Sequence, residues 1–421
     1  MVKDGDFRKD QCCRRALRRV GVVAGILILG LAVLTLAVPR SLWDWRLDRA
    51  RTYLLGVLHP VEEIPAPASG SSSQGGFFIL PTSFPTRETD QGNSISTPVH
   101  IYHAELPPPE FDLQNDFQDW NNCGPATLAL ALRMYGWKGD QYTVAEKIKP
   151  ERADRNVNIE ELARFVEQNA PGLDAVYRVG GTLPLLKSFL AAGYPVIVEK
   201  SFRISESYWP GDDRWAGHYL LLTGYDDATQ TFTSQDAYSG PNRPVRYVNL
   251  EVDWFAFNNV YLVLFPEDKP QMAEILLGSD QDETLNRQNA IRRLTAMQTV
   301  RKEDPFLWFN LGSNLTYLEQ YQEAARIFDR ARSLGLPQRM LRYQFTPFMA
   351  YYQQGDWKTL ASLIAYALER TPNSEEVLLW KARLLFSQKK KAEAISLTKQ
   401  ALKYNSSFEE ARAALTYFST P

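Results

Sequence analysis

The chain has 421 residues, 44% hydrophobic and 23% charged, an ordinary globular composition that allows about two to three domains. Its net charge of −2 gives no sign of the basic surface expected of a nucleic-acid-binding protein. It has three cysteines, Cys12, Cys13 and Cys123, two of which lie near the N-terminus, far from the third.

An uncharged apolar run occupies residues 20–38, and a helix of this length matches the roughly 30 Å hydrocarbon core of a bilayer. Seven basic residues lie within 1–19, against four within 40–51, so the N-terminus is expected to be cytoplasmic. A cleaved signal peptide is the alternative, but no clear A-x-A site follows the run. We therefore expect a single-pass signal anchor in the cell membrane, with the C-terminal domains extracytoplasmic.

Residues 39–110 follow this predicted membrane helix and, from about residue 56, are rich in Pro, Ser, Gly and Thr. They show no sustained helical period, which is typical of a linker. The sequence predicts a stalk that holds the folded part of the chain away from the membrane.

Residues 111–268 alternate between the periods of helices and strands, with most of the helices first. A mostly antiparallel sheet is expected after them, which is an α+β plan in which a helical half faces a sheet half. Helices are predicted at 123–135, 143–149, 158–169 and 182–192, and strands at 173–179, 194–199, 218–225, 231–235, 246–250 and 259–265.

Cys123 stands at the predicted start of an apolar helix, where unpaired N–H groups and the helix dipole favour a thiolate. The predicted membrane topology separates it from Cys12 and Cys13, which leaves it without a disulfide partner. An unpaired thiol in an oxidising compartment indicates reactivity. An inert buried cysteine is the alternative.

A reactive thiolate needs a base, and a third group must orient that base. His218 is the only histidine within 111–268, and it opens an apolar predicted strand. A hairpin turn at 224–227 would bring Asp236, on the next strand, beside it. Asp226 and Asp227 are weaker candidates for the orienting acid, since Asp is favoured in turns for backbone reasons.

Acyl transfer also needs donors aimed at the developing oxyanion. The backbone N–H of Cys123 is one candidate, and the side-chain amide of Gln118 is the other, with Gln114 and Asn122 as rivals. The long loop 201–217 ends on the predicted histidine strand, and its Trp209 and Trp215 could cover a substrate groove. A solvated loop without selectivity is the alternative.

Residues 283–421 are helical in pattern and contain a repeat. Ala324, Leu360 and Ala394 occupy equivalent positions 36 and 34 residues apart. The segment resembles three tetratricopeptide repeats plus a half, which implies an all-α solenoid of stacked helix pairs. The residues that match one repeat unit are Trp308, Leu311, Gly312, Leu315, Ala324, Phe328 and Ala331.

FQDWNNCGPATLALAL, with GHYLLLTGYDD and SQDAYSG, resembles the papain-like cysteine peptidases of the bacteriocin-processing, double-glycine leader peptidase family, in its stand-alone bacterial form. The resemblance covers about 111–266. It implies Cys123 as nucleophile, His218 as general acid and base, Asp236 as orienting acid and Gln118 as oxyanion donor. Gln118 lies five residues before the cysteine, where papain-like enzymes usually have six, and Ala237 replaces the familiar proline after the acid.

Together these features predict a membrane-anchored, outward-facing cysteine peptidase that cleaves peptide or isopeptide bonds through a thioester acyl-enzyme. Its substrate would be a protein or peptide, and the repeats would recruit that substrate or an unknown protein partner. No cofactor, nucleic acid or metal is predicted, because no spacing resembles a zinc or calcium site. The alternatives are a papain-like acyltransferase and a non-catalytic surface scaffold that acts through its repeats. Leader trimming is not expected, because family members that do it act in the cytoplasm, fused to a transporter.

Overall fold

The computed structural model describes residues 62–67, 101–149, 156–207 and 209–420, together with several residues between 47 and 60. The predicted membrane helix at 20–38 lies outside these residues. Within the part of the chain described, no helix is both long and apolar enough to cross a bilayer.

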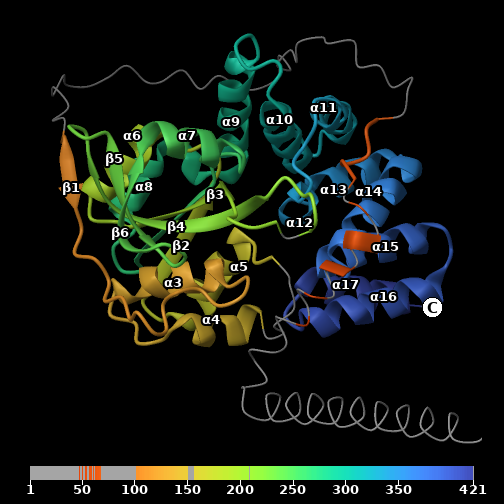
Figure 1. Cartoon of the computed structure of the whole chain (residues 1–421), viewed down its shortest axis with the longest axis horizontal. Helices are drawn as coiled ribbons and strands as arrows, with labels where there is room; N and C mark the ends of the chain where they lie inside the picture. Colours follow the sequence, from red (N-terminus) through yellow and green to blue (C-terminus); the bar gives the residue numbers. More distant parts are fainter. Residues whose placement is uncertain are drawn as a thin grey trace, which may run out of the picture. The chain divides into compact units, whose positions relative to one another are not determined.

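The chain divides into two units, residues 1–60 with 208–210, and residues 61–207 with 211–421. Within the first unit, the described residues between 47 and 58 are helical. The second unit contains the sheet, its covering helices and the C-terminal helices (Figure 1).

One antiparallel sheet forms the centre of the second unit, with the order β2-β7-β3-β4-β5-β6 and β1 paired to β4. The pairing of β3 with β4 extends over eight residues, from Val196 opposite Leu222 to Arg203 opposite Trp215. The strands are β1 (His103–Glu105), β2 (Leu173–Arg178), β3 (Val196–Arg203), β4 (Trp215–Asp226), β5 (Thr231–Asp236), β6 (Gly240–Arg246) and β7 (Tyr261–Pro266).

Helices cover both faces of this sheet, because successive strand residues point to opposite sides. Ile197 and Leu221 face a core shared with α3 and α5, whereas Val198 and Leu222 face a core shared with α6 and α7. Figure 1 shows the two helix groups on opposite sides of the sheet. These helices are α3 (Cys123–Arg133), α4 (Gln141–Ile148), α5 (Ile159–Asn169), α6 (Leu183–Ala191), α7 (Tyr247–Phe255) and α8 (Gln271–Leu277).

The predicted strand at 246–250 was wrong. Strand β6 ends at Arg246, and α7 begins at the next residue. The buried side chains of α7 are Leu250, Trp254 and Phe255, and the spacing of four residues from Leu250 to Trp254 is typical of a helix. Trp254 and Phe255 lie beyond the predicted five-residue strand, so their contribution to this pattern was not considered. The predicted turn at 224–227 was also displaced, since β4 continues to Asp226 and the turn occupies 227–230.

Beyond the sheet, the chain forms the C-terminal helical region, in which consecutive helices pack side by side (Figure 1). A Cβ at Gly312 would lie 2.8 Å from the ring of Phe328, so a glycine is needed where α10 and α11 meet. The helices are α9 (Glu283–Met297), α10 (Pro305–Tyr317), α11 (Tyr321–Ser333), α12 (Met340–Tyr343), α13 (Thr346–Gln354), α14 (Trp357–Arg370), α15 (Glu375–Ser387), α16 (Lys391–Tyr404) and α17 (Glu409–Ser419).

Two described parts of the predicted stalk are packed against the folded unit. His103–Glu105 forms β1 at one edge of β4, and residues 62–67 contact the C-terminal helical region. Composition alone predicted an unpacked spacer, because Pro, Ser and Gly cannot build a core of their own. These short segments instead pack on surfaces built by other parts of the chain.

Candidate active site

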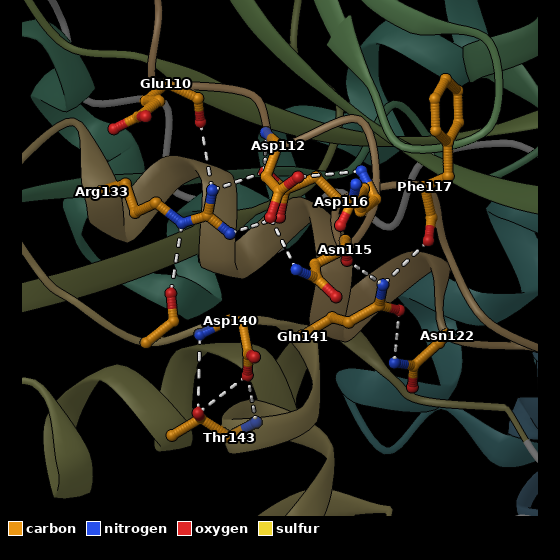
Figure 2. Close-up of polar contacts among 12 residues, drawn as sticks. Glu110, Asp112, Asn115, Asp116, Phe117, Asn122, Arg133, Asp140, Gln141 and Thr143 are labelled. Carbon is orange, nitrogen blue, oxygen red and sulfur yellow. Dashed lines mark hydrogen bonds and ion pairs between the residues drawn. The ribbon is translucent and has the colours of Figure 1, made fainter.

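The loop that leads to Cys123 is held by the side chain of Gln141, the first residue of α4. Its Oε1 accepts hydrogen bonds from the Asp119 amide at 2.9 Å and from Asn122 Nδ2 at 2.8 Å. Its Nε2 donates to the carbonyls of Asn115 and Phe117 at 2.6 and 2.8 Å (Figure 2). Gln141 is fully buried, so these bonds form away from water and fix the loop firmly.

An ion pair fixes the start of the same loop to the last turn of α3. Arg133 donates to both carboxylate oxygens of Asp116, and its Nη1 also reaches the Glu110 carbonyl at 3.1 Å (Figure 2). Asp116 is 3% exposed, and paired, charge-assisted hydrogen bonds of this kind add geometric specificity. The first residue of α4 and the last turn of α3 therefore both hold the loop before the cysteine.

Cys123 is the first residue of α3, and the nine residues that follow it up to Leu132 are buried. The turn before it places Asn121 in the left-handed region, with φ 51°, which asparagine tolerates better than most residues. Lys149 donates to the carbonyls of Trp120 and Asn121 at 2.7 and 3.1 Å. The thiol thus begins a rigid helix, at the end where the dipole favours negative charge.

His218 and Asp236 lie on adjacent strands and are in contact. Nε2 of His218 is 2.8 Å from Oδ1 of Asp236, which also accepts the Tyr238 amide at 2.8 Å. Nδ1 of His218 is buried and has no hydrogen bond of standard geometry within the described ranges. Because Asp236 occupies one ring nitrogen, Nδ1 is the nitrogen left for the Cys123 thiol.

Two aromatic rings shield this pair. Phe202 and Tyr238 pack on His218, with ring centroids 5.1 and 6.1 Å away, and His218 itself is only 3% exposed. Exclusion of water strengthens the hydrogen bond between histidine and aspartate.

The pKa values of the thiol and the imidazole are moved in opposite directions. Burial alone would raise the pKa of Cys123, but the contact with His218 and its positive charge lower it below its usual value. Burial would lower the pKa of His218, yet Asp236 and Cys123 raise it to about 9. Each group thus favours the charged form of the other, which shifts the pair towards a thiolate and an imidazolium.

Glu199 on β3 is a buried acid near the thiol that sequence reasoning missed. It is 7% exposed and lies opposite Tyr219, beside the His218 position of β4. Burial, followed by the negative charge of Cys123, raises its pKa well above the usual range. Both causes favour the neutral form of Glu199, which would add no second anion beside the thiol.

Gln118 is bound next to Asp236, at the end of β5. Its backbone N–H donates to the Ala237 carbonyl at 2.7 Å. Its Oε1 is buried and has no hydrogen-bond partner among the described residues. Of its rivals, Asn122 uses its side-chain amide on Gln141, and Gln114 is exposed. The role of Gln118 as the oxyanion donor stays a prediction.

The two acids at the β4–β5 turn have other partners. Oδ1 of Asp226 accepts the Ala228 amide at 2.8 Å. Asp227 binds Lys187 at 2.5 Å and the Tyr247 hydroxyl at 2.8 Å. Neither contact involves His218.

The two tryptophans predicted to cover a groove lie in different settings. Trp215 begins β4 and stacks on Phe257, with centroids 5.5 Å apart and planes at 4°. It also packs against Phe306 and Tyr343, from the α10 and α12 helices. Its described contacts therefore join the sheet to the C-terminal helical region. Trp209 belongs to the first unit, near Gly56. A role of either in substrate binding stays a prediction.

Sequence reasoning also missed Gln141, Lys149, Phe202 and Tyr238. Gln141 begins the amphipathic helix α4 and Lys149 directly follows that helix, and no spacing motif links either residue to the cysteine. Phe202 lies on the continuation of β3, which was predicted to end at 199. A longer β3 would have placed Phe202 in the strand that pairs with the His218 strand.

A thiol at a helix start, facing a histidine and an acid on adjacent antiparallel strands, is the arrangement of the papain-like cysteine peptidases. Residues 109–263 match the model described as the Peptidase_C39 like family, which supports placing this part of the chain among those peptidases.

Solved structures similar to the chain include two peptidases. A C39-like peptidase from Bacillus anthracis is 16% identical over 40% of this chain and 100% of that one, with a TM-score of 0.32. A double glycine motif protease from an AMS/PCAT transporter, solved in complex with the leader peptide, is 14% identical over 39% of this chain and 94% of that one, with a TM-score of 0.27.

A third similar structure is MamA from Desulfovibrio magneticus RS-1, 16% identical over 32% of this chain and 74% of that one, with a TM-score of 0.29. Among curated proteins, none matches the chain.

Proposed function

We propose that the chain is a cysteine peptidase in which Cys123 is the nucleophile and His218 the general acid and base. The observation that carries this proposal is the position of His218, which contacts Asp236 through Nε2 and lowers the pKa of Cys123. A structural histidine has no need of an acid on one side and a thiol on the other. The arrangement fits the activated nucleophile of acyl transfer.

The reaction begins with the Cys123 thiolate, which attacks the carbonyl carbon of the substrate. The oxyanion that forms would be held by the Cys123 amide and the Gln118 side chain. The His218 imidazolium gives its proton to the leaving amine, and a thioester to Cys123 remains. His218, now neutral, takes a proton from water as the water attacks the thioester, which releases the acid and restores the ion pair.

The predicted topology supplies the setting. A single membrane anchor at 20–38 would place the peptidase outside the cytoplasm, and the C-terminal helical region, with its resemblance to tetratricopeptide repeats, would present a surface for a protein partner. The substrate class is a peptide or protein on that side of the membrane. The same acyl-enzyme would transfer its acyl group if an amine replaced water.

The experiment compares the full chain with Cys123→Ala on a peptide library, followed by mass spectrometry. Cleavage products should appear only with the native cysteine, while circular dichroism shows the same fold for both. Equal cleavage by the two proteins would refute the assignment. Absence of cleavage and of acyl-enzyme by either would favour the non-catalytic scaffold.

A further inference from the structure

Residues 62–67, with the sequence EEIPAP, stand near the start of the second unit in the sequence and are not part of any helix or strand. Pro65 and Pro67 have φ fixed near −65°, and each restricts the residue before it to extended conformations. The segment is therefore stiff in the form in which peptide ligands are often bound.

The backbone of the segment is bound by two side chains of the C-terminal helical region. Arg332 of α11 donates from Nε and Nη2 to the Pro65 carbonyl, at 2.8 and 2.6 Å. The Tyr366 hydroxyl of α14 lies 3.0 Å from the Glu62 carbonyl and 2.9 Å from the Gln338 carbonyl, so its single proton is shared between the two. Between the Glu62 and Pro65 carbonyls, Ile64 is buried to 5% exposure in the same core cluster as Tyr366.

Arg332 is also held in position by residues other than the segment. Arg332 is 6% exposed, and its Nη1 donates to Asp329 and to the Tyr351 hydroxyl, both at 3.0 Å. Its guanidinium also lies over the Tyr351 ring, 5.5 Å from the centroid. A buried cation fixed by its own partners, with two N–H groups aimed at a carbonyl, is a preorganised binding group.

The acidic end of the segment contacts Gln338, which also binds the connection between β3 and β4. Gln338 donates from Nε2 to the Glu63 carboxylate at 3.2 Å. Its Oε1 accepts a hydrogen bond from the Asp213 backbone N–H at 3.0 Å, and the Gln338 backbone N–H donates to Asp213 Oδ2 at 2.9 Å. Asp213 lies two residues before β4, the strand of His218. The segment is thereby linked, through one glutamine, to the loop that enters the catalytic strand.

We infer that Arg332, Gln338 and Tyr366, with the pocket that buries Ile64, form a peptide-binding site that residues 62–67 fill in cis. We name these residues the docking site. Its ligand class is a stiff segment with an acid, a buried aliphatic side chain and then proline, held through main-chain carbonyls. While its own segment is bound, the docking site is closed to another segment of this class.

The test uses a fluorescent peptide that copies residues 59–70 and measures its anisotropy with full-length chains. In the native chain the docking site is filled, so the peptide should bind at least about 10-fold more weakly than to the Ile64→Asp chain, whose own segment is displaced. Ile101→Asp, which changes an exposed isoleucine at 47% exposure, is the matched control and should behave as the native chain does.

A second substitution assigns the site. Tyr366→Phe added to Ile64→Asp removes one neutral hydrogen bond and should weaken peptide binding about 3- to 10-fold. Equal peptide binding by the native and Ile64→Asp chains, or no binding by the Ile64→Asp chain, would overturn the proposal.

A measurement on the unaltered chain keeps the proposal testable if Ile64→Asp does not fold. A protease that cuts after glutamate should cleave after Glu62 and Glu63 at least about 10-fold more slowly in the native chain than in the free peptide, because bound segments resist cleavage. Equal rates would show that the segment does not occupy the docking site.

Discussion

At the scale of single residues, the site rests on two groups that each favour the charged form of the other. His218 lowers the pKa of Cys123, which stands at a helix start, and Asp236 raises the pKa of His218. Asp236 completes the series because the imidazolium lowers its pKa against the effect of burial. Removal of any one of the three changes the charge state of the others.

The pKa directions predict a bell-shaped dependence of peptide turnover on pH. The pKa of Cys123 is lowered, so the acidic limb, on which the thiolate gains a proton, should lie below the usual pKa of a thiol. The pKa of His218 is raised to about 9, so turnover should fall again as the pH rises through that value and the general acid is lost. Initial rates across pH 4–11 give the profile. A single ascending limb near the pKa of a free thiol would contradict it.

The second prediction concerns Gln118. Gln118→Ala should lower kcat by about 100- to 1,000-fold, because one oxyanion donor is lost, while alkylation of Cys123 stays unchanged. Steady-state kinetics with a cleaved peptide, combined with an alkylation assay, separates the two effects. Gln114→Ala, at an exposed position in the same loop, is the matched control. Equal kcat values for the two variants would remove Gln118 from the site.

At the scale of elements, the loop before Cys123 depends on a glutamine from another helix. Gln141→Ala should lower the free energy of unfolding by about 3 kcal/mol, since it leaves buried amide and carbonyl groups of the loop without partners. Urea denaturation measures the change. Gln114→Ala should cost less than about 0.5 kcal/mol, and a similar cost for both variants would contradict the role of Gln141.

The sequence predicted the elements whose signals are local. The helix after Cys123 has an apolar run with Pro125 near its start, and α5 has its predicted start at Asn158. The prediction for α7 was wrong, because the first residues of that helix have the pattern of a strand and its buried Trp254 lies beyond the predicted strand 246–250. The position of the β4–β5 turn was missed because Gln230, with φ 54°, takes the left-handed position instead of a glycine.

The candidate site was predictable only in part. The order and spacing of residue types led to Cys123, His218 and Asp236 as candidates, and the structure places His218 in contact with Asp236. Gln141 and Glu199 interact with residues on other elements of the chain, and no local sequence pattern predicts such contacts. The docking of 62–67 was missed for the same reason, since the partner arginine follows 267 residues later.

At the scale of the whole molecule, hydrogen bonds join the sheet domain to the C-terminal helical region. Asn258 and Asn314 bond to each other through both side-chain amides, and Asn310 donates to the Phe255 carbonyl at 2.6 Å. All three asparagines are buried, at 6% exposure or less. Polar contacts of this kind fix the relative placement of the parts within the second unit, which supports unfolding as one cooperative structure.

Asn310→Ala tests this connection. It should lower the free energy of unfolding by about 2 kcal/mol, because a buried carbonyl loses its donor and a small cavity remains. Asn169→Ala, in which the half-buried side chain bonds only within its own helix, should cost less than about 1 kcal/mol. Urea denaturation of both variants decides, and equal costs would show that the domain contact contributes little.

The central claim is that His218 favours the thiolate form of Cys123, and the rate of alkylation of Cys123 by iodoacetamide tests it most directly. Peptide mapping by mass spectrometry separates this cysteine from Cys12 and Cys13. The account predicts a clearly smaller loss of rate from pH 8 to pH 6 for the native chain than for a folded His218→Ala chain. A native rate that falls roughly 70-fold between pH 8 and pH 6, as for an ordinary thiol of pKa about 8.5, would contradict it.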